Sequence, residues 1–461
     1  MMEPMKTQTL ITLACVWTAL AFLVPAQPVF SQDDPARAQF GQTRFVIQIS
    51  PDHPDGQYRV GEDAVFTIRV LDRGSDVAKG TVYVHLFGKG GVGHLSDHEL
   101  PLAGKPVTVR GRLEQPGVLY AWATTTPDAP GRVRGDAGAA FDWPKIRSTN
   151  AAPADFRKFW DEQKALLAAV PVGAVVKLEP SRSPETNFDA YRVTLNNVDG
   201  AKVRAWLSKP KGAGKHPAYL KIPAGGVDGA KLDPKALYPG LGFMTMSVSW
   251  FDLPTDKPKE HYSKLDARDG DFYQCYLRHG VESREQFFYR RGILGMMRAI
   301  DYLTSREDWD GRTLIVDGGS SGGAGAIWVA GLDSRVTAAL IGVPAFTEPY
   351  GHAMDEFLEG LANGRCSTAA VRRTFSYYNP VNFARFIQCP VLIQTGLRDG
   401  NVFGAIAMHN LIPGQEKKIM IGPKQGHELF PPDFKEAQRT FVKEQLARAL
   451  PAGNSSPVKK P

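Results

Sequence analysis

The chain has 461 residues, of which 43% are hydrophobic and 22% are charged, a balance that excludes an intrinsically disordered protein. Its length favours two domains over one. The formal net charge of +7 is scattered along the chain, without a basic stripe interleaved with aromatic residues, so we expect a solvated surface and no nucleic-acid partner.

The first 31 residues have the pattern of a secretory signal peptide. Lys6 precedes the apolar run TLITLACVWTALAFLV, which is too short for a comfortable membrane span, and Ala26 or Ser31 stands where a cleavage site is expected. The sequence therefore predicts that residues 1–31 are removed and that the protein is secreted or periplasmic, with no membrane span after processing. An N-terminal membrane anchor, or a lipid-modified Cys15, is the alternative.

Three cysteines remain beyond this segment, which is too few for a disulfide framework. Cys389 lies in the apolar stretch CPVLIQTG and is interpreted as a buried small hydrophobic residue. In an oxidising compartment Cys275 and Cys366 are the candidates for a bridge, although spacing alone does not pair them. The cysteines lack metal-ligand spacing, and we expect no metal site.

Residues 40–145 show the alternation of half-buried β-strands. In AVFTIRVL the apolar Phe66, Ile68 and Val70 alternate with polar residues, and TVYVHLF, VTVRGRL and VLYAWAT repeat the pattern between Gly- and Asp-rich breaks. Several short strands at this spacing predict a small all-β sandwich of immunoglobulin-like type. Within it, the segment GHLSDHEL is interpreted as a surface loop rather than a metal site, although it holds three residues of ligand type, His94, Asp97 and His98.

Residues 150–450 alternate between short apolar runs and helical segments. PADFRKFWDEQKALLAAV, YRRGILGMMRAIDYLTSRE and GAGAIWVAGL are predicted helices, whereas AYLKIPAGG, FMTMSVSWF, TLIVDGG, AALIGVPA, PVLIQTG and KKIMIGP are predicted strands. This alternation indicates an α/β domain with a mostly parallel sheet covered on both faces. Residues 252–288 are interpreted as an insertion over one end of the sheet, and residues 451–461 as a disordered tail.

The stretch LIVDGGSSGGAGAIW places two serines among glycines where a predicted strand turns into a predicted helix. A catalytic serine needs an exposed Oγ on a sharp turn, and glycines on both sides let strand and helix pass closely, as in the G-x-S-x-G elbow. Two registers fit, one centred on Ser320 and one on Ser321, and the pattern does not choose between them. The alternatives are a glycine-rich connection without chemistry, or a phosphate loop, which would need a lysine after the glycines.

An acid and a base follow the serines, each just past a predicted strand. Asp399 comes after PVLIQTG and His427 after KKIMIGP, in the chain order that an elbow serine of this kind requires. We expect His427 to take the serine proton, Asp399 to orient the imidazole, and Glu428 to support His427. The rival candidates lie in a predicted helix, YGHAMDEF, and are His352, Asp355 and Glu356.

These stretches resemble the acetyl xylan esterase and cephalosporin C deacetylase family of α/β-hydrolases, over about residues 150–450. PADFRKFW is similar to the family's opening helix, FFYRRGILGMMRAIDYL to its tyrosine-arginine-arginine helix, and DGGSSGGA to its glycine-rich elbow. VRRTFSYYNPVNFA, TGLRDGNVFGAIAMHN and GHE are similar to three further family stretches. The resemblance implies an α/β-hydrolase fold with the nucleophile at Ser320, the acid at Asp399 and the base at His427.

The resemblance also implies an oxyanion hole. Ser321 takes the place of the family's glutamine, whose backbone N–H forms half of that hole, and the second N–H is expected near Ala224 or Gly225. The sequence differs from the family pattern in three places. SVSWFDLP stands where the family has an arginine-glycine-glutamine motif, GNVFG replaces the prolines usual after the acid, and a β-domain precedes the hydrolase part.

The expected function is that of a secreted serine esterase that removes acetyl groups from carbohydrate, through an acyl-serine intermediate and with no cofactor or metal. Its expected partners are acetylated carbohydrate or a small acetyl ester, and a homo-oligomer is left open. A broader carboxylesterase or a peptidase of the same fold is one alternative. A carbohydrate-binding or adhesion protein with an inactive hydrolase domain is the other.

Overall fold

The computed structural model describes residues 45–89, 92–125, 133–148, 151–180, 188–227, 241–266, 276–347, 358–362, 364, 366–428 and 431–449. The predicted signal peptide, the tail 451–461 and Cys275 lie outside these residues. No helix in the described part of the chain is long and apolar enough to cross a membrane.

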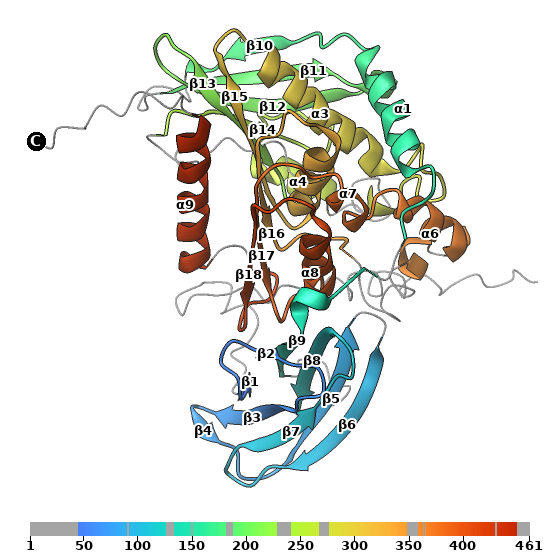
Figure 1. The fold of residues 1–461 in the computed structure, drawn as a ribbon, viewed down its shortest axis with the longest axis vertical. Coiled ribbons are helices and arrows are strands. Elements are labelled where there is room, and N and C mark those ends of the chain that lie inside the picture. Colours follow the sequence, from blue (N-terminus) through green and yellow to red (C-terminus); the bar gives the residue numbers. More distant parts are fainter. Residues whose placement is uncertain are drawn as a thin grey trace, which may run out of the picture.

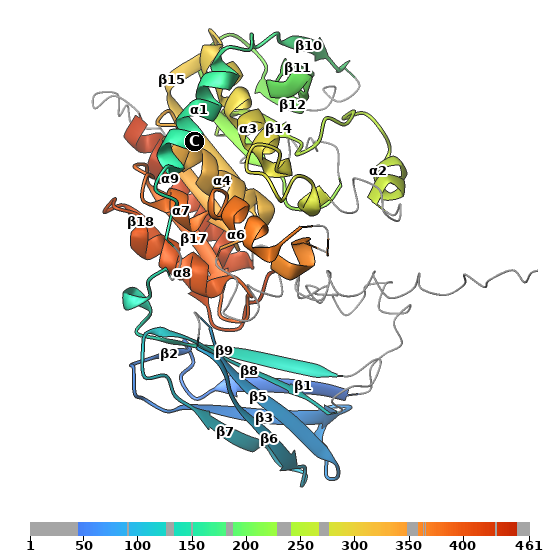
Figure 2. The ribbon, with the colours of Figure 1, turned by 90° about the vertical axis from the view of Figure 1, so that its right-hand side faces the viewer.

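The described residues between 45 and 141 form strands and their connections, and a short 3-10 turn follows them. These elements are β1 (Phe45–Pro51), β2 (Gln57–Tyr58), β3 (Ala64–Asp72), β4 (Ser75–Asp76), β5 (Thr81–Lys89), β6 (Gly93–Pro101), β7 (Val107–Gly111), β8 (Gly117–Thr124), β9 (Arg134–Phe141) and η2 (Trp143–Lys145). They form one sheet in the order β1-β3-β4, with β7 also on β3, and a second in the order β2-β9-β8-β5-β6. We call these two sheets the front sheets (Figure 2).

Alternating side chains fill the space between the front sheets, as the sequence predicts. Phe66, Ile68 and Val70 are buried while the residues between them are not. The prediction for GHLSDHEL was wrong in one respect, because this segment is the strand β6 and not a loop. Asp97 in that strand pairs with His85, at 2.6 Å, and with His94, at 2.9 Å, so its carboxylate is already used.

A second set of elements alternates between strand and helix. The strands are β10 (Val175–Leu178), β11 (Phe188–Asn196), β12 (Lys202–Pro210), β13 (His216–Ile222), β14 (Met244–Val248), β15 (Trp309–Gly319), β16 (Ala338–Gly342), β17 (Val391–Gly396) and β18 (Lys417–Gly422). The helices are α1 (Phe156–Ala168), α2 (Lys259–Asp266), α3 (Phe288–Ser305), α4 (Ser321–Leu332), α6 (Thr368–Ser376), α7 (Val381–Ala384), α8 (Val402–Leu411) and α9 (Pro432–Ala449), with 3-10 turns η4 (Val198–Gly200) and η5 (Tyr276–Arg278).

These strands form one nine-stranded sheet in the order β10-β11-β12-β14-β13-β15-β16-β17-β18. Strands β13 to β18 pair in parallel, and β10, β11 and β12 extend the sheet as antiparallel strands. Helix α9 covers one face, and α3, α4, α7 and α8 lie on the other (Figure 1). The predicted mostly parallel sheet covered on both faces is confirmed.

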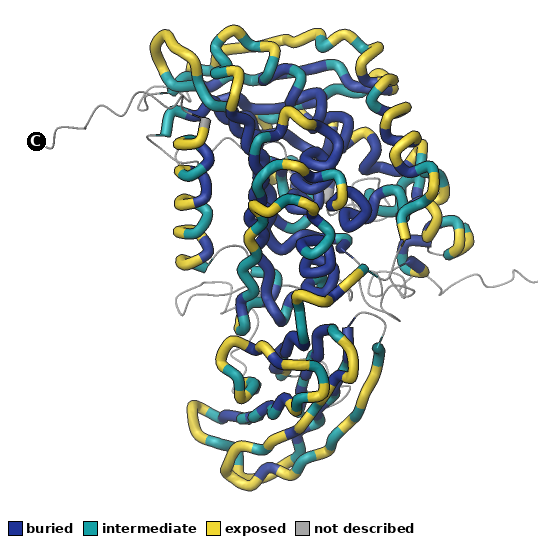
Figure 3. Tube along the Cα trace, viewed as in Figure 1, coloured by how far each residue is buried: buried dark blue, intermediate teal, exposed yellow. Residues whose placement is uncertain are grey.

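The central strands and α4 are the most deeply buried part of the fold (Figure 3). Every residue of β14, β16 and β17 is buried. In β16 this explains the continuous apolar run AALIG, whereas β14 and β17 each bury two polar side chains as well. The insertion predicted at 252–288 contributes α2 and η5 to the described residues. Because parallel strands end at one edge, the loops after β13, β15, β17 and β18 meet there.

The described cysteines carry no disulfide. Cys366 and Cys389 are free thiols, and Cys275, the other half of the candidate bridge, lies outside the described residues. Cys389 is partly buried against the core, close to the interpretation from sequence, and burial raises the pKa of its thiol to about 12.

A buried arginine ties α1 to α3. The Arg298 guanidinium donates to the backbone oxygens of Leu167 and Val170, at 2.5 and 2.7 Å, where α1 ends. We expect Arg298→Met to lower the free energy of unfolding by about 2–4 kcal/mol, because the two backbone oxygens lose their charged hydrogen-bond donor. Urea unfolding measures this, with the exposed Lys158→Met on α1 as the control. A loss no larger than that of the control contradicts the account.

Candidate active site

Ser320 stands on the sharp turn between β15 and α4. Its backbone lies at φ 56° and ψ −122°, a region that side-chain-bearing residues avoid at a cost of about 1–3 kcal/mol. The turn needs glycines because a Cβ at Gly318 would lie 2.1 Å from the backbone oxygen of Gly322. Although Ser320 precedes the helix, its side chain makes no capping hydrogen bond, so Oγ is left for another partner.

That partner is His427. Its Nε2 lies 2.8 Å from Ser320 Oγ, and its Nδ1 lies 3.0 Å from Asp399 Oδ2. The structure thus brings together three side chains that lie far apart in the sequence. Asp399 follows Ser320 by 79 residues, and His427 follows Asp399 by 28. The geometry also separates the two registers: Ser320 faces the imidazole, whereas Ser321 is buried and contacts the loop after β13.

Asp399 is held from several sides. It is 1% exposed, and its Oδ1 accepts the backbone N–H of Asn401 at 2.9 Å. Its own N–H donates to the backbone oxygen of Gly396 at 2.9 Å, which closes the turn after β17. With one carboxylate oxygen held by this turn, the other is directed at His427.

Asp399 and His427 shift each other's pKa. Burial acts to raise the pKa of Asp399, but the hydrogen bond and the charge of His427 outweigh it, so the pKa is lowered and the carboxylate stays ionised. Burial acts to lower the pKa of His427, but the hydrogen bond and the charge of Asp399, with a smaller contribution from Glu428, raise it. The imidazole is therefore a stronger base than a histidine in water.

The predicted oxyanion residues lie on the other side of Ser320. The backbone N–H groups of the first turn of a helix have no acceptor within that helix, and Ser321 opens α4. Gly225 packs against Ser321, since a Cβ built on Gly225 would lie 3.1 Å from Ser321 Oγ and 3.3 Å from Tyr276 Oη. Tyr276 Oη in turn accepts the N–H of Gly226 at 3.3 Å. The loop after β13 thus reaches the start of α4, as the resemblance implies.

Of the other candidates, Glu428 accepts the backbone N–H of Gly426 and so holds the loop before His427. The rivals in YGHAMDEF, His352, Asp355 and Glu356, lie outside the described residues. Sequence reasoning missed Asn401, and it also missed two residues of the front sheets, Lys89 and Asp136, which contact the turn that carries Asp399. Lys89 and Asp136 do not stand in a motif, so only the folded arrangement shows their contacts with this turn.

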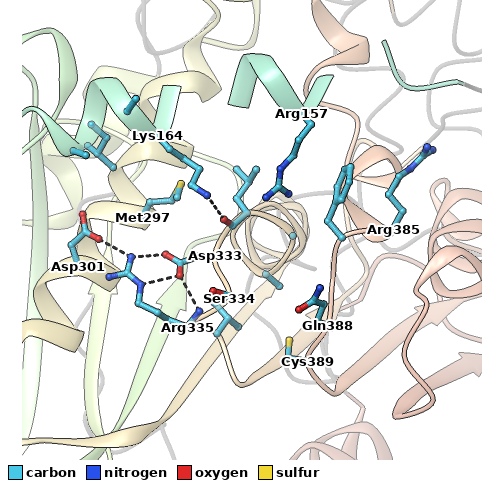
Figure 4. Close-up of a pocket in the computed structure, with 18 residues that line it drawn as sticks. Arg157, Lys164, Met297, Asp301, Asp333, Ser334, Arg335, Arg385, Gln388 and Cys389 are labelled. Carbon is cyan, nitrogen blue, oxygen red and sulfur yellow. Dashed lines mark hydrogen bonds and ion pairs between the residues drawn. The ribbon is translucent and has the colours of Figure 1, made fainter. Parts of the chain in front are cut away.

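A pocket of about 680 Å³ lies away from this site (Figure 4). It surrounds Asp333 at the far end of α4, roughly 18 Å from Ser320 along the helix axis. Three of its charged side chains pair with each other: Arg335 binds Asp333 at 2.6 Å and Asp301 at 2.7 Å. This pocket brings no base to a nucleophile, whereas the loops at the carboxyl edge of the sheet do.

Comparison with known proteins agrees with this arrangement. The sequence profile of the acetyl xylan esterase (AXE1) family matches residues 142–445. The acetyl esterase Axe7A of Xylanibacter ruminicola is 28% identical over 363 residues, which cover 76% of this chain and 79% of that protein.

Two solved structures share the fold. An acetyl xylan esterase from Paenibacillus sp. R4 has a TM-score of 0.56 at 24% identity, over 66% of this chain and 98% of that one. Acetyl xylan esterase 1 from Thermoanaerobacterium sp. JW/SL YS485 has a TM-score of 0.55 at 21% identity, over 66% and 97%. The shared part is thus nearly the whole of each of those chains and two thirds of this one.

The Asp399–His427 pair predicts that the pKa of His427 falls when the Asp399 carboxylate is removed. In the parent protein the pKa of His427 lies above its ordinary 6.5. In Asp399→Asn the two main raising causes are lost, while burial and the smaller contribution of Glu428 remain, so we expect this pKa to fall. NMR titration of the histidine ring protons measures both values, and His409, whose pKa is lowered by burial, is the internal control. An unchanged His427 pKa in Asp399→Asn would show that the pair is not formed.

Proposed function

The chain belongs to the acetyl xylan esterase family, and from this premise we propose that it is a serine esterase that removes acetyl groups from carbohydrate. The observation that carries the proposal is the position of His427, which bridges Ser320 at 2.8 Å and Asp399 at 3.0 Å. The relative named as an acetyl esterase supports the choice of acyl group.

The geometry suits a two-step acyl transfer. As Ser320 Oγ attacks the ester carbonyl, its proton passes to His427 Nε2, and Asp399 stabilises the imidazolium that results. The oxyanion is stabilised by the N–H of Ser321 and by an N–H of the loop at Gly225. The bond between the acyl carbon and the sugar oxygen then breaks. His427 returns the proton to the leaving alcohol, and the acetyl group stays on Ser320. Water, deprotonated by His427, then releases acetate and restores the serine.

An aromatic pocket supports the preference for a short acyl chain. It is small and is lined by Leu277, Phe287, Tyr289, Trp328, Phe346, Leu361, Phe375 and Tyr378. Phe346 follows Ala345, whose N–H donates to the Ser320 carbonyl at 3.0 Å, so one lining residue adjoins the backbone of the nucleophile. Tyr289 of this pocket lies near Ser321. Tightly packed rings leave little room beyond a methyl group.

Three finer statements belong to the same proposal. We propose that residues 1–31 are a signal peptide and that the enzyme is secreted or periplasmic. We propose that residues 40–145 form an immunoglobulin-like domain and that the hydrolase domain spans 150–450. The insertion at 252–288 is proposed to cap the site, since Tyr276 from it reaches Gly226 at 3.3 Å.

The two serines of the elbow predict different outcomes. Ser320→Ala removes the nucleophile, and we expect kcat for p-nitrophenyl acetate to fall by roughly 10⁵ or more. Ser321→Ala keeps the backbone N–H of the oxyanion hole, so it is the matched control and should only slow turnover. Steady-state kinetics on both variants test which serine is the nucleophile. A Ser320→Ala enzyme as active as Ser321→Ala would exclude Ser320.

The aromatic pocket predicts a change of acyl preference. Phe346→Ala should open space and raise kcat/KM for butyryl relative to acetyl p-nitrophenyl ester by roughly tenfold, the scale of one or two methylenes in an apolar pocket. Leu95→Ala, an exposed apolar residue on the front sheets, is the control. If the butyryl-to-acetyl ratio is the same in both variants, this pocket does not receive the acyl chain.

The alternatives are separated by substrate and by labelling. A broader carboxylesterase would hydrolyse long acyl esters as well as acetyl esters, and a peptidase would hydrolyse peptide anilides. An inactive carbohydrate-binding protein would not react with a fluorophosphonate, whereas the proposed enzyme forms one adduct, which is lost in Ser320→Ala. Acetate release from a panel of acetylated glycans then identifies the natural sugar class.

A further inference from the structure

The turn that carries Asp399 is covered by the front sheets. Leu397 is fully buried in a cluster with Val118 and Ala140, which belong to β8 and β9. The approach is so close that a Cβ at Gly138 would lie 2.3 Å from the Leu397 backbone oxygen. The front sheets are therefore not tethered at a distance but packed on the loop that holds the acid of the triad.

The next residue of the turn links three segments. The Arg398 guanidinium binds Asp136 of β9 at 2.6 Å and donates to the backbone oxygen of Lys424 at 3.0 Å. The backbone N–H of Arg398 donates to the oxygen of Gln425, also at 3.0 Å. Gln425 lies two positions before His427, so Asp136 supports the acid turn and the base loop through one side chain.

Lys89, at the end of β5, reaches Asp399 itself. Its Nζ donates to the Asp399 backbone oxygen at 2.7 Å, and it lies 4.5 Å from the centre of the Tyr120 ring. The side chain is 3% exposed. Its positive charge is one of the influences that keep the Asp399 carboxylate ionised.

A lysine in this position does not favour folding. Burial lowers the pKa of Lys89 to about 7, although the charges of Asp399 and Asp136 act to raise it. Desolvation of the ammonium is costly, and an apolar side chain of the same length would avoid that cost but would leave the Asp399 backbone oxygen without this donor. The position of Lys89 is therefore better explained by what it does to Asp399 than by the stability of the fold.

We propose that Lys89 and Asp136 are positioning residues of the catalytic site, and that the front sheets act as a clamp that holds the Asp399 turn against the His427 loop. The inference rests on the proposed esterase function. It assigns the front sheets a part in turnover beyond any binding of carbohydrate. Neither residue touches the substrate, and both act through Asp399 and Arg398.

The test compares activity with stability in one variant. In Lys89→Met we expect kcat for p-nitrophenyl acetate to fall roughly 10- to 100-fold with KM little changed, because the acid is displaced by a fraction of an ångström. We expect the melting temperature at pH 6 to change little, because the lost hydrogen bond to the Asp399 oxygen offsets the relieved desolvation of the ammonium. Lys105→Met, an exposed lysine of the front sheets, is the matched control and should change neither quantity. A residue with only a structural role would lose stability and activity together.

The pH dependence of stability has a defined sign. The folded pKa of Lys89, about 7, lies below the ordinary lysine value of 10.5, so the cost of burying its charge is full below about pH 7 and disappears as the pH rises towards 10.5. The stability of Lys89→Met relative to the parent should therefore fall as the pH rises between these values. The groups that face Lys89 are Asp399, Asp136 and Tyr120, which the variant leaves in place.

A second pair of variants tests the clamp without Lys89. Gly138→Ala should push the Leu397 backbone away and lower kcat. Gly111→Ala in β7 is its control, because that Cβ would meet only side chains of the front sheets, with Leu119 nearest at 2.6 Å. If Lys89→Met does not fold, Asp136→Asn and the glycine pair decide the question.

A readout independent of turnover separates this inference from the proposed function. The deshielded proton NMR signal of the His427–Asp399 hydrogen bond should be present in the parent and in Lys105→Met, and broadened or lost in Lys89→Met. If the parent hydrolyses no ester, the proposed function fails while this readout still decides the clamp. A folded Lys89→Met with an unchanged signal, and with kcat within about twofold of an active parent, overturns the inference.

Discussion

The site depends on the strained backbone of Ser320. The φ of 56° at this residue directs Oγ out of the turn, where it meets His427 instead of capping α4. Such a conformation persists only when its surroundings hold it, and here residues 313–319 of β15 and all of α4 are buried. Gly318 and Gly322 allow the close passage that the turn requires. Without that packing the serine would relax into an ordinary helix cap.

The acid and the base are held differently from the nucleophile. Ser320 lies on the rigid junction of a central strand and a buried helix, whereas Asp399 and His427 lie on turns near the edge of the sheet. β17 and β18 are the last strands on that side, so the sheet itself offers these turns less support. The front sheets pack on the Asp399 turn and supply the charged contacts from Lys89 and Asp136.

Much of this site could be predicted from the sequence because its signals are local. A strand followed by Asp399 and a later strand followed by His427 converge in any parallel sheet, since all such strands end at one edge. The choice between Ser320 and Ser321 was not local, because glycines flank both serines equally. The contacts of Lys89 could not be predicted either, because it ends an alternating strand like many surface lysines and its partner lies 310 residues away. The small residues of β9 were the one available signal, as a strand rich in glycine and alanine often lies close to another backbone.

The central claim is that the acyl group passes through Ser320. The most direct test quenches the enzyme with acid during turnover of an acetyl ester and maps the modified peptide by mass spectrometry, using Asp399→Asn if slower deacylation is needed. We predict a single acetyl group on Ser320. Product formation with an unmodified Ser320, or with the acetyl group on Ser321, would contradict the account.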